Sequence, residues 1–484
     1  MGHSNNLGYD KTDPISIFEF AIPLIGKTLR QAVGDDAINN YLDSCKTISE
    51  NKGGLGQMVE ELHYHYKPNS SREPDFAEAG VELKTTGLKR LLNDTLQIKE
   101  RLVVDMINYD EVIKETFEMS TFYRKFKLLL LIFYLYEKGL EQFDRFFIYV
   151  ALWKIPEKDM LIIKHDYQVI VDKIKRGEAH LLSEGDTEYL GACRKGQKGD
   201  SLRKQPCSPI RAPRRAFSLK PAYMRTVLEY IKKSEKTAVV NFDYEIRDNQ
   251  LVSPKELEGD SFEDIILRKF SAFKGMSYDN LCNAIGHRYD SSKDKYAILA
   301  NRIVLGKPGK VNLTEEFKKA GLQLKTIRVQ QNGNIKEAMS FENIDYHEVL
   351  ETEYWEDSRL YEIFSGRFLF VIFKADGGKI KYFSHKRNTF IEEDSYTLDK
   401  VFFWTMPTID LEIAEQYWKD LKRVIESNQI EPKFFPKNER FHVRPKATNS
   451  QDLTENPHGG LVKKYCYWFN NNYVKEIVRN NGTK

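Results

Sequence analysis

Two carboxylates and a lysine lie close together in a segment of the N-terminal half, which reads PDFAEAGVELK from residue 74 to residue 84. In a β-strand, Glu82 and Lys84 project from the same face, and Asp75 on the preceding turn can reach that face. Paired carboxylates suit Mg²⁺. A neighbouring lysine can orient or deprotonate a water molecule and offset charge on a phosphate. The segment therefore indicates phosphodiester hydrolysis, in which a metal acts as a Lewis acid on the leaving oxygen.

The same spacing also has an ordinary explanation. A bare Asp-x₆-Glu-x-Lys pattern turns up in surface hairpins of unrelated proteins, so spacing alone does not establish a catalytic centre. The surrounding sequence has to decide between the two interpretations.

The elements around this segment are typical of an α/β domain. Apolar spacing predicts a helix over 15–33, interrupted at Pro23, and a second helix over 55–66. Three strand-length apolar runs follow at 80–86, 101–107 and 128–136, the last predicted to be a buried strand because it is too short to span a membrane. A helix is then predicted from Pro156 toward Lys175. This order predicts an α/β domain with a mixed sheet.

Composition limits the remaining possibilities. A chain of 484 residues is too long for one compact core, so we expect two domains. The net charge of +3 gives no overall basic field, although nine basic residues and one acid lie between Arg194 and Lys220. The five cysteines have no metal-ligand spacing, which is typical of reduced cytoplasmic thiols. The polar N-terminus has no signal-peptide pattern, so we expect a cytoplasmic protein without a membrane role.

Three patterns of the first half recur in the second half in the same order. GKTL at 26–29 is matched by GMSY at 275–278, AGVELKT at 79–85 by AGLQLKT at 320–326, and KLLLLIF at 127–133 by RFLFVIF at 367–373. The offsets of 249, 241 and 240 residues are nearly constant. The ordered set predicts an ancient duplication of a whole domain. We expect domains at 1–235 and 263–484, joined by an acidic, weakly periodic linker at 236–262.

The motifs around the acidic segment resemble those of the MutH mismatch-repair nickase, and more closely those of the two-lobed Sau-three-A type of restriction endonuclease, which shares the GATC site. The resemblance rests on KGGLGQMVE at 52–60, PDF at 74–76 and GVELKT at 80–85, and it covers nearly the whole chain. It implies an α/β chain of two PD-(D/E)xK nuclease lobes. By position, Asp75 and Glu82 match the metal-binding carboxylates, Leu83 a backbone carbonyl ligand, and Lys84 the catalytic lysine.

Two further residues match the nuclease centre of that family. Glu60 matches an additional acidic residue, although beside Glu61 it could also be a solvated helix carboxylate. Lys125 matches a lysine near the scissile phosphate, although between Arg124 and Lys127 it could also be a charge at a strand edge. The resemblance implies that Glu60 and Lys125 both belong to the centre.

A second set of residues is implied to contact DNA. The loop EYLGACRK at 188–195 matches the family's base-reading loop, and a lysine such as Lys195 can donate to O6 and N7 of guanine. Basic residues farther along suit phosphate contacts, which position the protein without reading sequence. Ser218 stands where the nickase has a tyrosine, so readout there differs. The complete set is Lys52, Arg194, Lys195, Arg211, Arg214, Arg215 and Lys220.

The second half keeps the motif positions without the chemistry. The counterparts of the five catalytic positions are, in chain order, Asn301, Glu316, Gln323, Lys325 and Ser365. The neutral Gln323 removes the pair of carboxylates. The reading loop persists as HVRPKA at 442–447, followed by YWF at 467–469. The resemblance therefore implies an allosteric DNA-binding lobe whose contacts are Arg444, Pro445, Lys446 and Trp468.

The resemblance predicts a type II restriction endonuclease that cuts double-stranded DNA at GATC, 5′ of the guanine, with Mg²⁺. The second lobe would bind another copy of the site and stimulate cleavage, by self-association of two proteins on DNA or by looping the DNA. Two alternatives remain open. A repair nickase is disfavoured by the duplicated lobe, and a GATC-binding regulator that does not cut is disfavoured by the intact acids of the first half.

Overall fold

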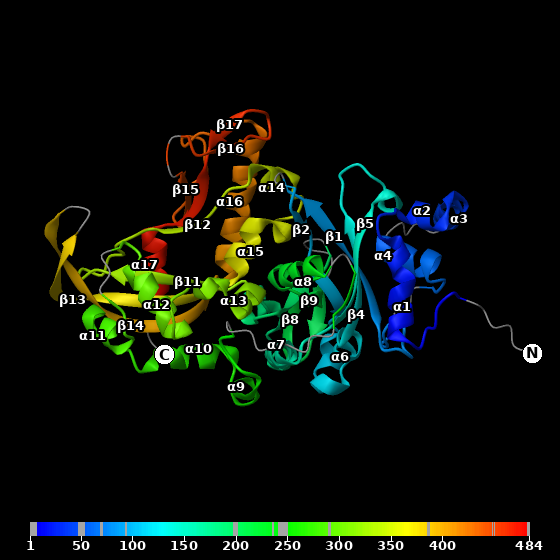
Figure 1. Ribbon diagram of the computed structural model, residues 1–484, viewed down its shortest axis with the longest axis horizontal. Helices are drawn as coiled ribbons and strands as arrows, with labels where there is room; N and C mark the ends of the chain where they lie inside the picture. The colour runs from blue at the N-terminus through cyan, green and yellow to red at the C-terminus, as the bar shows by residue number, and fades with distance from the viewer. Residues whose placement is uncertain are drawn as a thin grey trace, which may run out of the picture. The chain divides into compact units, whose positions relative to one another are not determined.

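The computed structural model divides the chain into two compact units, Met1–Asp248 and Asn249–Lys484 (Figure 1). It describes residues 7–46, 54–67, 71–91, 94–196, 202–234, 237–240, 250–288, 292–384, 388–447, 449 and 451–481. Each unit contains its own sheets and helices.

A mixed five-stranded sheet forms the centre of the N-terminal unit, in the order β10-β5-β4-β1-β2. β4 runs parallel to β1, with Glu82 opposite Leu129, and antiparallel to β5. The apolar run that predicted a buried strand is β4, and residues 129–135 are all buried. The bounds are Glu82–Arg90 for β1, Leu96–Ile98 for β2, Leu128–Leu135 for β4, Phe147–Lys154 for β5 and Thr237–Val240 for β10.

The strand predicted at 101–107 lies outside this sheet. It forms β3 (Leu102–Met106), which pairs with β9 (Arg215–Leu219), and β9 pairs in turn with β6 (Leu190–Arg194) in a separate antiparallel sheet. The expectation that all three apolar runs share one sheet was therefore wrong. Apolar alternation indicates that a segment is a strand, but it carries no information about which strand becomes its partner.

Helices cover both faces of the mixed sheet. On one face, Leu130 and Ile132 of β4 pack in a core with the N-terminal helices. On the other face, Trp153 of β5 contacts Tyr230 of α8, with ring centroids 6.3 Å apart. The predicted helix toward Lys175 is confirmed as α7. The bounds of the longer helices are Pro14–Ala21 for α1, Asp35–Lys46 for α3, Glu157–Lys175 for α7 and Pro221–Lys233 for α8.

The short helices of this unit follow local capping signals. The predicted break at Pro23 is confirmed, because a 3-10 turn (η1, Ile22–Leu24) separates α1 from α2 (Leu29–Val33). The helix predicted over 55–66 begins as α4 (Leu55–Met58) and continues as a π-helical turn, η2 (Val59–His63). The remaining elements are α5 Tyr109–Val112, η3 Phe117–Met119, α6 Thr121–Phe126, η4 Gln142–Asp144, η5 Ala179–Leu181, η6 Glu184–Asp186, β7 Leu202–Gln205 and β8 Ser208–Pro213.

The segment 236–262, expected to be a linker, is divided between the two units. Its residues 237–240 form β10 and extend the mixed sheet by pairing in parallel with β5. Residues from Leu251 onward belong to the C-terminal unit, where Leu251 and Val252 are buried and α9 (Pro254–Gly259) follows. Residues 241–249 lie outside the described part. Weak periodicity did not reveal these elements because each is only a few residues long.

The C-terminal unit repeats the centre of this topology, although its main sheet in the described part has three strands where that of the N-terminal unit has five. Its sheets have the orders β11-β13-β14 and β12-β18-β15, with β11 parallel to β13, as β1 is to β4. The strand bounds are β11 Gln323–Val329, β12 Met339–Asn343, β13 Arg367–Ser384, β14 Thr389–Thr405, β15 Phe441–Pro445, β16 Leu453–Glu455, β17 Leu461–Lys463 and β18 Tyr465–Phe469. The helices are α10 Phe262–Ser271, α11 Tyr278–Ala284, α12 Lys295–Leu305, η7 Val311–Leu313, α13 Glu315–Ala320, α14 Tyr346–Glu351, η8 Trp355–Asp357, α15 Arg359–Ser365, α16 Thr408–Glu426 and α17 Asn471–Asn480.

Equivalent backbone bonds recur at the repeated motifs. Gly26 N–H donates to Phe147 O at 2.8 Å and Gly275 N–H to Leu398 O at 2.7 Å, and both glycines have positive φ, 80° and 81°. The strand match needs a correction of one residue. Glu82 pairs with Leu129, whereas Gln323 pairs with Phe368, so Phe368 rather than the next residue is the counterpart of Leu129. Apolar runs align almost equally well in neighbouring registers, which is why the sequence missed this shift.

Two further observations concern the chain as a whole. No helix in the described part is long and apolar enough to cross a membrane. The cysteines whose side chains the structure describes are free thiols: Cys193, Cys207, Cys282 and Cys466.

Candidate active site

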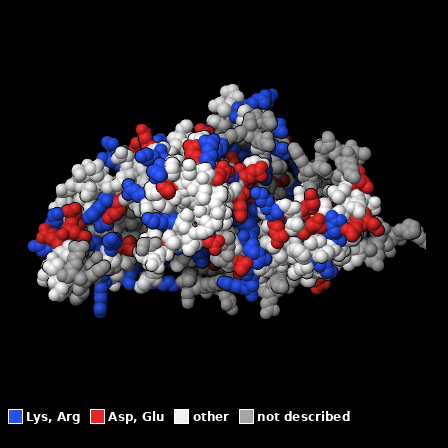
Figure 2. Space-filling model, turned by 90° about the horizontal axis from the view of Figure 1, so that it is seen from above, with Lys and Arg blue, Asp and Glu red and all other residues white. Residues whose placement is uncertain are grey.

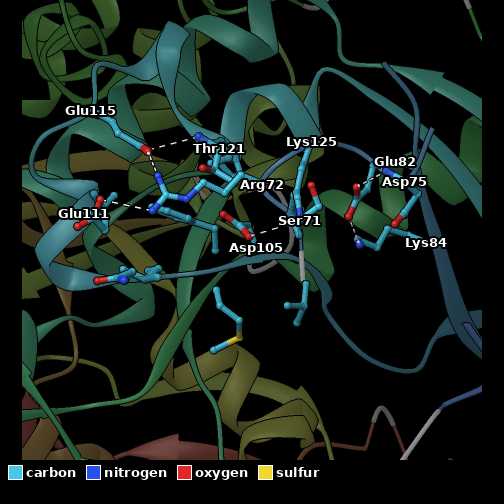
Figure 3. Close-up of a pocket in the computed structure, with 18 of the residues that line it drawn as sticks. Ser71, Arg72, Asp75, Glu82, Lys84, Asp105, Glu111, Glu115, Thr121 and Lys125 are labelled. Atoms are coloured by element: carbon cyan, nitrogen blue, oxygen red, sulfur yellow. Dashed lines mark hydrogen bonds and ion pairs between the residues drawn. The ribbon is translucent and has the colours of Figure 1, made fainter. Parts of the chain in front are cut away.

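One pocket of the N-terminal unit, with a volume of about 470 Å³, is lined by all five residues that the sequence indicated as catalytic. These residues are Glu60, Asp75, Glu82, Lys84 and Lys125. They come from η2, from the turn before β1, from β1 and from α6. Figure 3 shows Asp75, Glu82 and Lys84 grouped on one side of the pocket.

A tight turn before β1 holds Asp75 against the start of the strand. Gly80 in this turn has a φ of 68°, a left-handed conformation that glycine adopts without strain. Asp75 Oδ2 accepts a hydrogen bond from Leu83 N–H at 2.9 Å, and Asp75 N–H donates to Glu82 Oε2 at 3.2 Å. These two bonds hold the carboxylates of Asp75 and Glu82 next to each other.

The alternation of β1 separates the charged side chains from the core. Glu82 and Lys84 share one face, as predicted, and Lys84 Nζ lies 2.5 Å from Glu82 Oε1. Leu83 lies between them, is 2% exposed and belongs to the apolar core. Leu83 therefore anchors the strand in the core. The alternation of side chains along the strand turns Glu82 and Lys84 to the opposite face, into the pocket.

Burial and nearby charges change the acidity of these groups. Burial raises the pKa of Glu82; the Lys84 cation opposes this shift and Asp75 adds to it. The pKa of Glu60 is raised to about 7 by burial and by repulsion from Asp75. Burial acts to lower the pKa of Lys84, but the carboxylates of Glu82 and Asp75 outweigh it and raise the pKa. Carboxylates that repel one another in a buried site are stabilised by a cation.

The donor atoms of this cluster fit a magnesium ion. Asp75 Oδ1 has no hydrogen-bond partner among the described residues, and the carboxylate of Glu82 is adjacent. Nowhere in the described ranges do three His, Cys, Asp or Glu side chains gather closely enough to hold a metal by themselves. Two carboxylates and the Leu83 carbonyl would leave positions for water, which Mg²⁺ retains. The set fits Mg²⁺ better than zinc, which needs three or four protein ligands.

Lys125 lies on a helix rather than at a strand edge. Ser120 caps α6 by accepting the Tyr123 N–H, and the helix turns Lys125 into the pocket. Its Nζ is 4.0 Å from Oδ1 of Asp105, a pocket residue on β3 that sequence analysis missed. Burial raises the pKa of Asp105. The only signal for it in the sequence was one acid within the apolar run LVVDM.

A group of ion pairs on the other side of the pocket was also missed. Arg72 lies 3.4 Å from Glu111 and 3.9 Å from Glu115, and Glu115 accepts the Thr121 N–H at 3.3 Å (Figure 3). The pairs connect the chain just before Asp75 with α5 and α6. Arg72 is 60% exposed, so these pairs contribute little to stability and mainly orient the segment. Their partners are too far apart in sequence to form a recognisable motif.

The residues predicted to contact DNA separate into an accessible and a buried set. The accessible residues are Arg194, Lys195, Arg211 and Arg214. Exposed Arg203 and Lys204 on β7, which pairs with β8, enlarge this surface and were not identified from the sequence. On the face drawn in Figure 2, basic and acidic side chains are interspersed. Lys52 lies outside the described residues.

Two predicted phosphate contacts are corrected by the structure. Arg215 is 3% exposed, and its guanidinium donates to the carbonyls of Ala192, at 2.5 Å, and Leu182. Lys220 is 6% exposed and donates to Thr187 O. Both cations are bound to buried carbonyls, because a buried charge without such bonds would be costly. Arg214 lies just before β9, whose five residues are all buried, so an exposed arginine is followed directly by a buried one.

In the C-terminal unit, neutral amides stand at the metal-binding positions. Gln323 begins β11 as Glu82 begins β1. Asn312 Oδ1 accepts the Leu324 N–H at 2.9 Å, which is the bond that Asp75 accepts in the other unit. Asn312 is therefore the contact counterpart of Asp75.

The residues matched to Asp75 and Glu60 by sequence have structural partners instead. Glu316 is 2% exposed and accepts the Leu251 N–H at 2.9 Å. Asn301 accepts the Val311 N–H at 2.6 Å. These side chains hold backbone groups, which explains why they remain polar although no acid pair is left.

The counterpart of Lys125 also needs correction. Ser120 and Ser358 cap the equivalent helices α6 and α15. Counting from these caps, buried Ile363 takes the position of Lys125. Ser365, the residue matched by sequence, is two positions later. One position comes from the strand register, and the other from one additional residue between Ser358 and Phe368 compared with Ser120 and Leu129. Neither Ile363 nor Ser365 carries a charge.

The predicted reading loop of the C-terminal unit is accessible. Arg444, Pro445 and Lys446 are exposed at the end of β15, and the Arg444 guanidinium lies 5.9 Å from the ring centroid of Trp468 on β18. Trp468 also stacks on His442, with centroids 6.3 Å apart and planes inclined by 16°. Lys446 Nζ donates to Phe341 O at 2.7 Å. A cation and an aromatic ring thus lie together on an exposed strand end.

Comparison with known proteins agrees with this geometry. The family model described as DNA mismatch repair enzyme MutH matches residues 64–166, which include Asp75, Glu82, Lys84 and Lys125. The chain is also 31% identical to the type II restriction enzyme Sau3AI of Staphylococcus aureus, and the match covers 93% of this chain and 96% of that enzyme.

Proposed function

The chain belongs to the MutH-related family of type II restriction enzymes that includes Sau3AI and is a site-specific endonuclease, and on this premise we propose that it cleaves double-stranded DNA at GATC, 5′ of the guanine, with Mg²⁺. The observation that carries the proposal is the meeting of Glu60, Asp75, Glu82 and Lys84 in one pocket. An enzyme of this kind acts on DNA in the cytoplasm.

We assign the pocket residues to separate tasks. Asp75, Glu82 and the Leu83 carbonyl would hold Mg²⁺, which when bound supplies Lewis acidity at the phosphate and lowers the pKa of water. Lys84 orients the attacking water and offers its charge to the phosphate. Glu60, whose pKa of about 7 lets it exchange a proton near neutrality, assists the same water.

Lys125 and its partner would act on the scissile phosphate. The ion pair that Lys125 forms in the pocket is a long one, because Asp105 Oδ1 is 4.0 Å from its Nζ. Asp105 would hold the lysine in the pocket without neutralising it by a close contact. This arrangement supports a role of Lys125 in binding the phosphate that is cut.

DNA contacts are proposed for the accessible basic residues only. Lys195 at the end of β6 would read guanine in the major groove, and Arg211 and Arg214 would hold phosphates. Arg194 stands next to Lys195 and is exposed in the same loop. Lys52 keeps its proposed DNA contact from the family match. Arg215 and Lys220 are proposed to stabilise the loop from within.

The C-terminal unit is proposed to be a degenerate copy of the nuclease domain that binds a second GATC site. Its sheets repeat the strand order of the N-terminal unit, while Gln323 and Asn312 replace the metal-binding acids. Arg444, Pro445, Lys446 and Trp468 would contact the DNA. Binding there stimulates cleavage through differential affinity for two states of the enzyme, with self-association on DNA as one route.

Plasmid cleavage tests the proposed function directly. The protein is incubated with methylated and unmethylated plasmid, with and without Mg²⁺, and the ends of any fragments are sequenced. Double-strand breaks 5′ of G in GATC, only with Mg²⁺, support the proposal. Nicked circles alone would favour a repair nickase, and intact plasmid that is nevertheless bound would favour a non-cleaving regulator. Cuts at another sequence would overturn the GATC assignment.

A further inference from the structure

Tyr66 lies between the two segments that carry acids of the active site. Its backbone N–H donates to Glu60 O at 3.1 Å, which ties it to the π-helical turn. Its ring packs edge-on against Phe76, with centroids 5.4 Å apart and planes inclined by 77°. Phe76 directly follows Asp75. The phenol ring is thus fixed by the neighbours of both Glu60 and Asp75.

The hydroxyl of Tyr66 is buried and has no hydrogen-bond partner among the described residues. The neighbouring tyrosines differ in this respect. Tyr64 donates to Ile17 O at 2.8 Å, and Tyr9 donates to Tyr64 O at 3.0 Å. A buried hydroxyl without a partner costs stability, so it calls for an explanation such as a role in a functional state.

The acids of the site lie close enough to the hydroxyl to affect its acidity. Burial raises the pKa of Tyr66 well above its usual range, and the carboxylates of Asp75, Glu60 and Glu82 raise it further. The phenol therefore keeps its proton and can act only as a donor toward these acids. Carboxylates are the strongest acceptors available to such a donor.

We propose that Tyr66 is a positioning residue of the metal site, and that its hydroxyl donates a hydrogen bond to the Asp75–Glu60 carboxylate pair in the enzyme loaded with DNA and metal. The inference rests on the metal site of the proposed function. A donor behind a ligating carboxylate fixes its orientation and leaves its outer oxygen for the metal.

The variant Tyr66→Phe tests this role, with Tyr64→Phe as the matched control. Tyr66→Phe removes only the oxygen, so the metal-free protein should melt roughly 2–4 °C higher once the unpaired buried hydroxyl is gone. Its affinity for Mn²⁺, measured by calorimetric titration, and its cleavage rate at limiting Mg²⁺ should each fall about 10–100-fold. Tyr64→Phe loses a satisfied bond, so it should melt lower with unchanged metal affinity.

The outcomes separate this inference from the proposed function. A more stable Tyr66→Phe protein with weaker Mn²⁺ binding supports the positioning role. Unchanged Mn²⁺ affinity and unchanged cleavage in Tyr66→Phe, with Asp75→Ala inactive, would overturn the inference and leave the proposed centre standing. If Asp75→Ala also cleaves normally, the metal site itself is misassigned. A Tyr66→Phe protein that melts lower would show that the hydroxyl has a structural partner.

Discussion

The strands β1 and β11 occupy equivalent places in the two units and differ in what they carry. Both begin after a turn with a glycine in the left-handed region, Gly80 at 68° and Gly321 at 66°. Both pair in parallel with the next long strand. Glu82 stands at the start of one and Gln323 at the start of the other. Gln323 and Asn312 together leave β11 without the carboxylate pair that Glu82 and Asp75 supply at β1.

The lysines that follow show the electrostatic consequence. The pKa of Lys84 is raised, because Glu82 and Asp75 outweigh the effect of burial. The pKa of Lys325 is lowered to about 8 by burial, assisted by repulsion from Lys446. Lys325 occupies the strand position of Lys84 without the paired carboxylates that surround Lys84. The comparison teaches that the backbone scaffold and the catalytic chemistry depend on different residues, so one can persist without the other.

Removing the acids should produce the largest effect. Asp75→Ala or Glu82→Ala in the N-terminal unit should abolish cleavage while DNA binding is largely kept, because each removes a metal ligand rather than a groove contact. The matched change in the other unit, Gln323→Ala, should leave cleavage of a one-site plasmid unchanged. Plasmid cleavage and gel-shift binding measure the two properties. Normal cutting by Asp75→Ala would remove the basis of the proposed centre.

The two lysines should differ almost as strongly. Lys84→Ala should slow cleavage by about 10²–10⁴-fold, the usual contribution of a group that moves or orients a proton. Lys325→Ala, at the equivalent strand position without the paired carboxylates, should cut a one-site plasmid at the normal rate. Single-turnover rates at saturating Mg²⁺ compare the variants. A similar loss in both would mean that the lysines serve a common structural purpose.

A double substitution in the C-terminal unit should remove stimulation by a second site. With Arg444→Ala and Lys446→Ala, a two-site plasmid should be cut no faster than a one-site plasmid, whereas the unchanged protein should show a difference within the ~5–150-fold range of typical couplings. Salt is held fixed because phosphate contacts make affinity strongly salt-dependent. Arg444→Ala alone controls for the loss of the bond from Lys446 to Phe341 O. Equal rates on both plasmids for both proteins would indicate a structural lobe.

The smallest effects should separate base readout from phosphate binding in the N-terminal unit. Lys195→Ala should cost roughly 1–3 kcal/mol of discrimination at one base pair. Arg214→Ala should weaken binding to GATC and to a scrambled site alike and reduce the salt slope by about one. Binding isotherms on both duplexes at several salt concentrations give both quantities. Equal weakening on both duplexes by Lys195→Ala would reassign this residue to phosphate.

Several features of the fold and the site were predictable from sequence because they are local. Strand alternation correctly put Glu82 and Lys84 on one face. The apolar run at 128–136 was correctly interpreted as a buried strand, and Pro23 as a helix break. The repeated patterns indicated which residues of the second half to compare with the first. The strand and helix inferences need only the chain within a few residues, whereas the repeat was visible because its motifs recur in the same order at offsets of 249, 241 and 240 residues.

Tertiary structure alone decided the features that depend on distant partners. In the folded chain β3 lies outside the sheet of β1 and β4, and Asp105 lies next to Lys125. Tertiary structure also buried Arg215 on carbonyls of other segments. The sequence by itself determined the local periodicity and the residue types of the catalytic set, since these follow from chain geometry. Strand partners, burial and the contacts of each charge were settled only by packing, because they depend on segments tens of residues apart that meet only in the folded chain.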